Sequence, residues 1–360
     1  MIADFFSASY GEARAKFLAA ADGLGAVQSM EHPSALGPSG EPLFTDLLRI
    51  GPVPGEADAV CLVNSATHGI EGYCGSGCQV RLLREGLASA APYGVAIVLV
   101  HALNPYGFAH GRRVTEENVD LNRNFIDHAR QPAPSGYSRL HAHLVPDHWH
   151  GATREDADSA LAALREEMGA RAYQQAVTSG QYEHPDGLFF GGLRPAWSNA
   201  TWRGIIDRHA AGARHVAFID LHTGLGPNGF GELIATNAPA PDVEQRMRHW
   251  WGEVTSPDRG TSTSAPLRGT LSNAFDTLGE VEKTCVALEF GTVSLPEMLE
   301  AVRADNWLYA RGGAEHSPHF ASIKMQIRAA FYDERAAWME MVSDRASDVF
   351  ERAIRGLGED

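Results

Sequence analysis

Cysteine is scarce in this chain, which has 360 residues and only four cysteines, Cys61, Cys74, Cys78 and Cys285. Their spacing is too irregular for a disulfide framework or for paired C-x-x-C zinc modules. Cys74 and Cys78 lie four residues apart on one face of an expected helix. We interpret them as small buried side chains, with a redox or extra metal-binding role as the alternative.

Positive charge is scarce as well, because 30 Lys and Arg stand against 45 Asp and Glu, a formal net charge of −15. Nucleic acids and anionic membranes bind a basic face that releases their counterions, so we expect neither as a partner. An anionic small substrate stays compatible with this charge. Only three of the basic residues are lysines, which we attribute to genomic base composition, so only arginines within motifs count as candidates for carboxylate recognition.

Long apolar runs are missing too. No segment approaches the roughly 18 apolar residues that a membrane span requires, and there is no periodic repeat or low-complexity tract. The first residues, Met-Ile-Ala-Asp-Phe-Phe-Ser-Ala, lack the basic segment and apolar core of a secretory signal. Hydrophobic residues make up 44% of the chain, as in globular proteins. We therefore expect a cytoplasmic protein that is not embedded in a membrane.

Short apolar segments alternate with helical ones along most of the chain. We expect strands over residues 43–50, 59–66, 96–103, 215–221, 231–235 and 284–288, and helices over 10–25, 71–90, 201–211, 242–253, 295–310, 318–332 and 334–355. Residues 26–42 are polar and rich in proline, which predicts an irregular connector, and Ser198 or Asn199 is the expected N-cap of the helix over 201–211. Alternating strands and helices indicate one three-layer α/β/α domain over residues 1–360, with helices on both faces of a central mixed, mostly parallel sheet.

Residues 104–199 are mostly irregular, with one expected helix over 154–176. We treat residues 126–197 as an insertion whose role the sequence does not reveal, although long ordered loops in compact enzymes are usually functional. Its glycine-rich stretch at 187–192 would suit a substrate-facing loop. A cluster of histidines also lies there, which we interpret as a solvated loop, with a second metal site as the alternative: His141, His143, His148 and His150.

Three of the expected strands end in a metal ligand or an acid–base group. One strand leads to His68 and Glu71, a second to His222 and a third to Glu289. Open α/β sheets place their sites at the carboxyl ends of strands, so these side chains can converge. Two imidazoles and one carboxylate suit a catalytic Zn²⁺ with an open position for water, and Glu289 is our candidate for the general base that serves the leaving amine.

A fourth motif follows the strand over 96–103 and contains Arg112, Arg113, Asn122 and Arg123. Arginine forks suit a substrate carboxylate or an oxyanion. Spacing alone does not assign a role to each arginine.

The string Asp-Leu-Asn-Arg-Asn-Phe at 120–125, with His-x-x-Glu before it and a later histidine and glutamate at strand ends, resembles the zinc carboxypeptidase family and its deacylase relatives, aspartoacylase and succinylglutamate desuccinylase. The resemblance spans residues 59–291. The strings Asp-Leu-His-Thr-Gly at 220–224 and Leu-Glu-Phe-Gly-Thr at 288–292 are closer to the deacylase branch and to an uncharacterised bacterial subgroup.

This resemblance implies a carboxypeptidase-like α/β fold and a role for each motif residue. One Zn²⁺ would be bound by His68, Glu71 and His222, with Glu289 as general base. Arg113 would polarise the scissile carbonyl, with Arg112 as the alternative, and Asn122 and Arg123 would hold the terminal carboxylate of the substrate. The tyrosine that closes over the substrate in digestive carboxypeptidases has no clear counterpart. Tyr309 and Tyr182 are candidates, while Trp307 and His316 are candidates for the pocket, with helix packing as the alternative.

The sequence therefore predicts a zinc-dependent hydrolase of an amide bond in a small substrate with a free carboxylate, most simply a metallocarboxypeptidase that removes a C-terminal residue from a small peptide. The alternatives are a deacylase of N-acyl amino acids and an inactive relative that binds metal or peptide. A serine hydrolase is disfavoured, because Gly75-Ser76-Gly77 lacks the glycine two residues before the serine that a nucleophile elbow requires. Oligomeric state cannot be read from the sequence.

Overall fold

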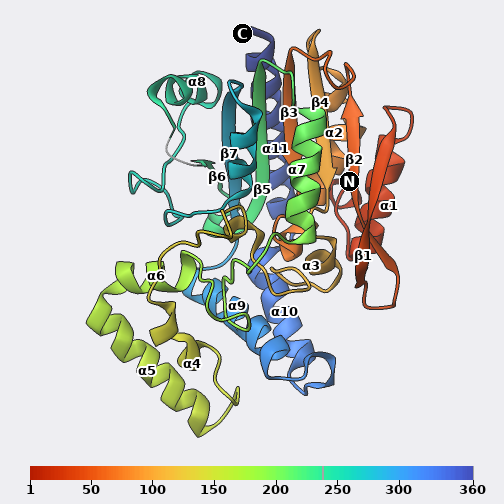
Figure 1. Cartoon of the computed structure of the whole chain (residues 1–360). Coiled ribbons are helices and arrows are strands. Elements are labelled where there is room, and N and C mark those ends of the chain that lie inside the picture. The colour runs from red at the N-terminus through yellow and green to blue at the C-terminus, as the bar shows by residue number, and fades with distance from the viewer. Residues whose placement is uncertain (237–238, 360) are drawn as a thin grey trace.

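The computed structural model of the chain describes residues 1–236 and 239–359. Within these ranges seven strands form one sheet in the order β1-β2-β4-β3-β5-β7-β6 (Figure 1). The strands are β1 (Val27–Leu36), β2 (Pro42–Ile50), β3 (Ala59–Asn64), β4 (Val95–His101), β5 (His215–Asn228), β6 (Gly231–Ala235) and β7 (Glu282–Gly291). The four central strands are parallel, and β1, β2 and β6 pair antiparallel at the edges.

Helices cover both faces of this sheet, which confirms the expected three-layer α/β/α architecture with a mixed sheet. The α-helices are α1 (Tyr10–Ala21), α2 (Gly72–Arg84), α3 (Pro105–Ala109), α4 (His141–Leu144), α5 (Ala152–Met168), α6 (Ala170–Thr178), α7 (Trp197–His209), α8 (Pro241–Trp251), α9 (Leu295–Ala310), α10 (Phe320–Phe331) and α11 (Ala336–Glu359). Short 3₁₀ helices lie at Ile2–Asp4, Gly69–Glu71, Leu87–Ser89, Leu121–Arg123, Tyr137–Arg139, Leu271–Leu278 and Ala314–His316.

The alternation of side chains along β3 explains the two cores. Cys61 and Val63 pack in a cluster with residues of α1, α2 and α11, while Val60 and Leu62 pack in another with residues of α7. Successive side chains of a strand point to opposite faces, so a fully buried central strand supplies both cores from one continuous apolar run.

Three local predictions are wrong. Residues 26–42 hold the edge strand β1 rather than a connector, and its mostly exposed polar residues pair only with β2. The expected single helix over 154–176 is broken at Gly169, which has a φ of +80° and separates α5 from α6. Helix α7 begins at Trp197 with Ala196 as its N-cap, because the side chain of Asn199 donates to Asn124 instead.

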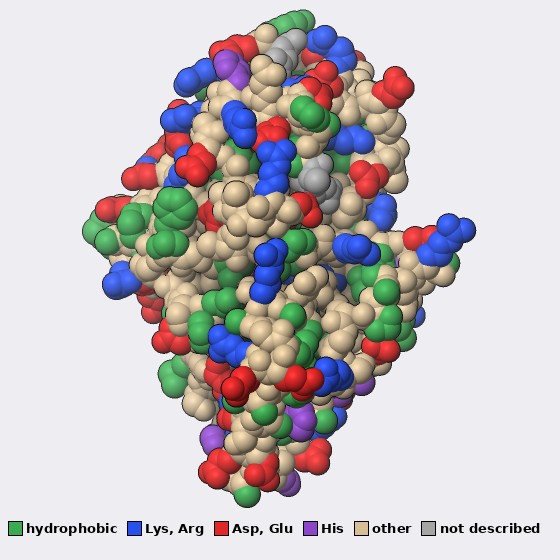
Figure 2. All heavy atoms as spheres, turned by 90° about the vertical axis from the view of Figure 1, so that its left-hand side faces the viewer, with side chains coloured by type: hydrophobic (Ala, Val, Ile, Leu, Met, Phe, Trp, Pro, Cys, Tyr) green, Lys and Arg blue, Asp and Glu red, His purple; other side chains and the backbone are tan. Residues whose placement is uncertain are grey.

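The insertion helices α4, α5 and α6 gather with α9 beyond one end of the sheet (Figure 1). Arg303 of α9 links α4 and α5, because its guanidinium donates to the main-chain carbonyl of Leu144 in α4 at 2.9 Å and to Asp158 in α5 at 2.6 Å. On the face shown in Figure 2, acidic and basic side chains are interspersed. None of the described helices is long and apolar enough to cross a membrane.

Candidate metal centre and substrate pocket

The turn after β3 carries His68 and Glu71. The chain leaves the strand through Ala66, whose φ of +57° is rare for a residue with a side chain. It then enters the 3₁₀ helix Gly69–Glu71, where the amides of Gly69 and Ile70 donate to the carbonyls of Arg113 and Arg112 at 3.1 and 2.8 Å. A Cβ atom on Gly69 would lie 2.0 Å from the main chain of Gly107, so only glycine allows this approach. The turn is thereby fixed to the loop that carries Arg113.

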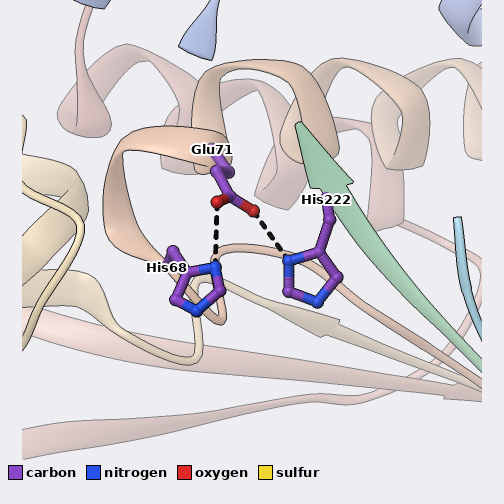
Figure 3. A group of neighbouring side chains, drawn as sticks. All are labelled: His68, Glu71 and His222. Atoms are coloured by element: carbon purple, nitrogen blue, oxygen red, sulfur yellow. Dashed lines mark hydrogen bonds and ion pairs between the residues drawn. The ribbon is translucent and has the colours of Figure 1, made fainter. Parts of the chain in front are cut away.

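His68, Glu71 and His222 converge at this turn, and their donor atoms lie within 4.8 Å of one another. His68 Nδ1 lies 2.8 Å from one carboxylate oxygen of Glu71, and His222 Nδ1 lies 2.7 Å from the other. Figure 3 shows the two imidazoles on either side of this carboxylate. All three residues are buried. The three sequence-predicted ligands are thus brought together by two strands that lie side by side in the sheet.

The outer nitrogen of each imidazole faces a further carboxylate. His222 Nε2 lies 2.7 Å from Asp220, and His68 Nε2 lies 3.1 Å from Asp120. Each imidazole thus lies between two carboxylates, with Glu71 at Nδ1 and an aspartate at Nε2, so the aspartate can accept the Nε2 proton when Nδ1 binds a cation. A carboxylate behind a histidine is the usual means of fixing a metal-binding tautomer. The donor set and its outer partners therefore fit a metal ion.

The charges in and directly behind the pocket wall also fit a cation. Four buried carboxylates, those of Glu71, Asp120, Asp220 and Glu289, stand against two guanidinium groups, those of Arg113 and Arg123. When all are ionised and the imidazoles are neutral, two negative charges are in excess, which is costly in a buried site. A divalent cation carries the charge that would balance them.

The pKa shifts reflect this excess of negative charge. Burial and the neighbouring charge of Glu71 raise the pKa of Glu289 above its usual range. Burial alone would lower the pKa of His222, but Asp220 and Glu71 outweigh it and raise the pKa well above its ordinary value. Both shifts favour protonation of the site, as expected where buried carboxylates outnumber the positive charges around them.

Glu289 lies directly opposite His222 in the register of β5 and β7. The amide of Leu225 donates to its carboxylate at 3.0 Å, which fixes one of its oxygens. Glu289 lines the same pocket as His68, Glu71 and His222. A carboxylate at this position can accept a proton from a group bound in the pocket.

Arg113 reaches into the centre of the site. Its guanidinium donates to Glu71 at 3.1 Å and to Asp120 at 3.1 Å, and its Nη2 lies 2.7 Å from His68 Nε2. Arg112 points the other way, donates to Asp305 at 3.0 Å and stacks on the ring of Tyr309. Of these two neighbouring arginines, only Arg113 is among the described residues that line the pocket.

Asn122 and Arg123 line the pocket beside Arg113. The Asn122 amide nitrogen lies 3.3 Å from His222 Nε2, and its oxygen accepts from the amide of Leu271. The guanidinium of Arg123 is buried, and it donates to the carbonyl of Thr178 through Nε at 3.2 Å and through Nη2 at 2.6 Å. The last turn of α6 therefore packs against Arg123.

The other aromatic and histidine candidates have structural contacts. Tyr182 donates to the carbonyl of Arg123 at 2.7 Å, and Trp307 donates to the carbonyl of Pro146 at 2.8 Å. Tyr309 packs on Arg112, and His316 lies in a 3₁₀ helix at Ala314–His316. None of the four is among the described residues that line the pocket.

The remaining wall of the pocket is mainly apolar and comes from several elements. Its members include Phe189, Phe218, Leu225, Ile234, Leu267, Leu271, Ala287, Met298 and Phe331. Gln174 and Thr178 of α6 complete it, so the insertion contributes to the site. This contribution of α6 could not be predicted from the sequence, because the contact depends on how a distant segment folds back onto the sheet.

A second group of possible metal ligands lies in the insertion. His141, His184 and Asp186 have donor atoms within 4.8 Å of one another. The two imidazole rings, however, stack with centroids 3.9 Å apart and planes at 18°. A metal ion lies in the plane of each imidazole that binds it, so near-parallel stacked rings do not direct their lone pairs at one point. Of the predicted histidine cluster, only His141 belongs to this group among the described residues.

Asp120 and Asp220 are the functional candidates that the sequence reasoning did not single out. Asp120 stands in the motif that carried the resemblance, but its role depended on the position of His68. Asp220 offered a signal, because it lies two residues before His222 on the same strand, and side chains at that spacing share a face. Phe189 lies in the stretch 187–192, which the sequence suggested as a substrate-facing loop, and it lines the pocket. The residues of α6 offered no signal.

Fold and site together define an α/β protein with a buried His–Glu–His group, a candidate general base and two arginines around one pocket. The chain belongs to the DUF2817 family, described as proteins of unknown function, whose model matches residues 6–345. A search of curated proteins finds no match to the chain.

Several solved structures are similar to this chain. A metallo-carboxypeptidase from Burkholderia cenocepacia has 14% identity and a TM-score of 0.45, with 96% of this chain and 68% of that chain covered. A putative succinylglutamate desuccinylase/aspartoacylase from Shewanella frigidimarina has 16% identity and a TM-score of 0.37, with 82% and 73% covered. A murein-tripeptide amidase from Escherichia coli O157 has 15% identity and a TM-score of 0.36, with 81% and 95% covered. Likeness at this level does not transfer an activity, so function is inferred from the chain's own residues.

Proposed function

We propose that this protein is a zinc-dependent hydrolase that cleaves an amide bond in a small substrate with a free carboxylate, and that it acts as a metallocarboxypeptidase. The observation that carries the proposal is the convergence of His68 Nδ1 and His222 Nδ1 on the two oxygens of Glu71, at 2.8 and 2.7 Å, beside the buried carboxylate of Glu289. The motif resemblance to zinc carboxypeptidases supports the same roles.

His68, Glu71 and His222 would hold one Zn²⁺. Bound zinc would polarise the scissile carbonyl and lower the pKa of a water molecule. Asp120 and Asp220 would accept the Nε2 protons of the two imidazoles while Nδ1 of each ring binds the ion.

Glu289 is the proposed general base. It would accept the proton of the attacking water and then return it to the nitrogen of the leaving amine. Burial beside Glu71 favours the protonated carboxyl group, which makes Glu289 a stronger base than an exposed glutamate. The hydrogen bond from Leu225 keeps the carboxylate in place during both transfers.

Arg113 is the proposed donor to the developing oxyanion, because its guanidinium lies beside both Glu71 and His68. Loss of such a donor costs about 10²-fold or more in rate. Asn122 and Arg123 would hold the substrate carboxylate, and both line the pocket next to Arg113.

The apolar wall suggests which residue the enzyme would release. Phe218 lies four residues before His222 on β5, and Ala287 lies two residues before Glu289 on β7, so these side chains share the face of the site. Ile234 of β6 pairs with Ala287 in the sheet and lines the same pocket. A C-terminal residue with an apolar side chain fits this wall.

A deacylase of N-acyl amino acids is the second candidate. The observation that favours it is the packing of α6 against Arg123, the proposed carboxylate-binding arginine. The carbonyl of Thr178, in the last turn of α6, accepts two hydrogen bonds from this guanidinium. An insertion helix packed over this arginine leaves less room for a long peptide than for a single acylated amino acid.

A substrate panel separates the two candidates. The zinc-loaded protein is offered peptides with free or amidated C-termini that end in apolar, acidic or basic residues, together with a series of N-acyl amino acids. A carboxypeptidase hydrolyses only the free peptides and prefers apolar ends, whereas a deacylase hydrolyses mainly the acyl amino acids. Absence of hydrolysis across the whole panel, with zinc bound, would contradict both.

Glu289→Gln tests the role of the base. The change removes the basic oxygen but keeps the size and a hydrogen-bond acceptor, so we expect unchanged zinc content and a loss of about 10²-fold or more in kcat. Glu232→Gln is the matched control, because Glu232 is a buried glutamate opposite Glu289 in the register of β6 and β7 but bonds to Thr255 and Thr263 instead. Full activity of Glu289→Gln would remove it from the mechanism.

A further inference from the structure

One aromatic residue contacts both arginines of the site. The ring centroid of Phe189 lies 5.5 Å from the guanidinium carbon of Arg113 and 5.6 Å from that of Arg123. Phe189 is buried and lines the pocket. Its ring therefore packs against both the proposed oxyanion donor, Arg113, and the proposed carboxylate-binding residue, Arg123.

The backbone of Phe189 is strained. Its φ of +51° lies in the left-handed region, which a bulky non-glycine residue rarely adopts. Such strain persists only where the surroundings fix the conformation, as they often do at functional sites. Glycine adopts this conformation without strain, so the presence of phenylalanine indicates a role for the ring itself.

The segment around Phe189 is fastened on both sides. The amide of Leu188 donates to the hydroxyl of Tyr137 at 2.7 Å, and the carbonyl of Phe189 accepts from the amide of Gln181 at 3.2 Å. The carbonyl of Phe190 accepts from the amide of Asp120 at 2.8 Å. The last bond fixes the residue after Phe189 to the main chain of Asp120, whose carboxylate contacts both arginines.

The physical need for the ring follows from the charges. Arg113 and Arg123 repel each other, and Asp120 contacts both, with an Arg113 Nε distance of 3.1 Å and an Arg123 Nη1 distance of 3.8 Å. The negative face of an aromatic ring attracts a guanidinium electrostatically. Phe189 supplies this attraction from a neutral side chain, so it holds both cations without competing for them as a carboxylate would.

We propose that Phe189 is a positioning residue for carboxylate recognition, which holds the guanidinium of Arg123 at the proposed carboxylate site beside that of Arg113, the proposed oxyanion donor. This inference rests on the proposed function of the pocket. It assigns to the insertion a direct part in selecting substrates with a free carboxylate, through a residue outside the motifs that the chain shares with zinc carboxypeptidases.

Two substitutions and a neighbouring control test it. Phe189→Leu keeps an apolar side chain but removes the ring, and Phe189→Tyr keeps the ring. Phe190→Leu is the matched control, because Phe190 is equally buried but packs in the core cluster on the α7 side of the sheet. Binding of N-acetylphenylalanine and of its amide to the zinc-free protein is measured by calorimetry.

We expect Phe189→Leu to weaken binding of the free acid about tenfold, equivalent to about 1.4 kcal/mol, and to leave the amide unaffected. Phe189→Tyr and Phe190→Leu should change the dissociation constant less than twofold. With the zinc-loaded enzyme, KM for carboxylate substrates should rise in Phe189→Leu while kcat falls less. Wild-type affinity and KM in Phe189→Leu would overturn the inference while leaving the hydrolase proposal intact.

If the wild-type protein neither binds nor hydrolyses these compounds, that result counts against the proposed function. A double-mutant cycle still tests the contact between the Phe189 ring and the Arg123 guanidinium. The unfolding equilibria of Phe189→Leu, Arg123→Lys and the double variant are compared with wild type. Coupling of about fivefold or more in the equilibrium constant supports the ring–guanidinium contact. Strict additivity would overturn it.

Discussion

Asp220 orients the proposed metal ligand His222 without itself being a proposed ligand. Its Oδ2 lies 2.7 Å from His222 Nε2, while its Oδ1 accepts from Asn64 at 2.9 Å and from Thr67 at 2.7 Å. Both oxygens are therefore held by groups of the β3 and β5 strands and the turn after β3. The orientation of His222 is fixed by the strands rather than by the pocket.

Asp220→Asn tests this support. The amide keeps the size of the carboxylate but lacks its charge, so we expect zinc to bind about 10–100-fold more weakly, measured by competition with a chromogenic chelator. Asp305→Asn is the control, because Asp305 is also a buried carboxylate but pairs with Arg112 and Lys324 outside the pocket. Equal zinc affinity in Asp220→Asn and wild type would contradict the support of His222 by Asp220.

The residues of the site differ in how far the sequence could predict them. His68, Glu71, His222 and Glu289 follow apolar strands directly, so the rule that sites form at strand ends was enough to bring them together. Phe189 lies in the stretch 187–192 that was expected to face the substrate, but its contact with the two arginines could not be predicted. That contact depends on bonds from residues 188–190 to Tyr137, Gln181 and Asp120, which link distant parts of the chain.

At the scale of elements, the turn between β3 and α2 determines where two of the ligands lie. It packs so closely on α3 that Gly69 leaves no space for a side chain. The loop that carries Arg113 also fixes the position of this turn, because the amides of Gly69 and Ile70 donate hydrogen bonds to its main-chain carbonyls. Two proposed ligands and the proposed oxyanion donor thus depend on one close contact.

Gly69→Ala should disturb this contact. The added Cβ would lie 2.0 Å from the backbone of Gly107, so we expect a loss of about 1–3 kcal/mol in the free energy of unfolding and a lower zinc content. Gly204→Ala is the contrast, because Gly204 is exposed in α7 with open space at its Cβ position. That variant should gain about 0.5–1 kcal/mol and keep its zinc, as measured by thermal unfolding and metal analysis. Similar behaviour of the two glycine variants would argue against the close contact.

The helices and buried strands were predicted better than the edge and the insertion. Helix α9 has the predicted bounds, because a serine N-cap, a proline and an apolar face mark it locally. Strand β1 lacks such a signal, since an edge strand with one partner tolerates polar residues and Pro33. The break at Gly169 was missed because glycine inside a helical pattern does not by itself end a helix.

At the scale of the whole molecule, the site lies where the sheet meets the insertion helices. Strands β5 and β7 supply His222 and Glu289, while α6 and the loop with Phe189 supply the opposite wall. A bound cation that contacts only the folded site would also stabilise the whole chain, by about 2.7 kcal/mol at a free concentration one hundred times its dissociation constant. Chelation should therefore lower the midpoint of thermal unfolding.

The zinc content of the purified chain tests the central proposal most directly. We expect about one zinc per wild-type chain by mass spectrometry, with loss of the ion in His68→Ala and His222→Ala, both checked for folding by circular dichroism. His141→Ala, which alters the stacked histidine pair of the insertion, should keep the ion. A wild-type chain without zinc after incubation with the metal, or His68→Ala and His222→Ala variants that retain it, would contradict the proposed metal centre.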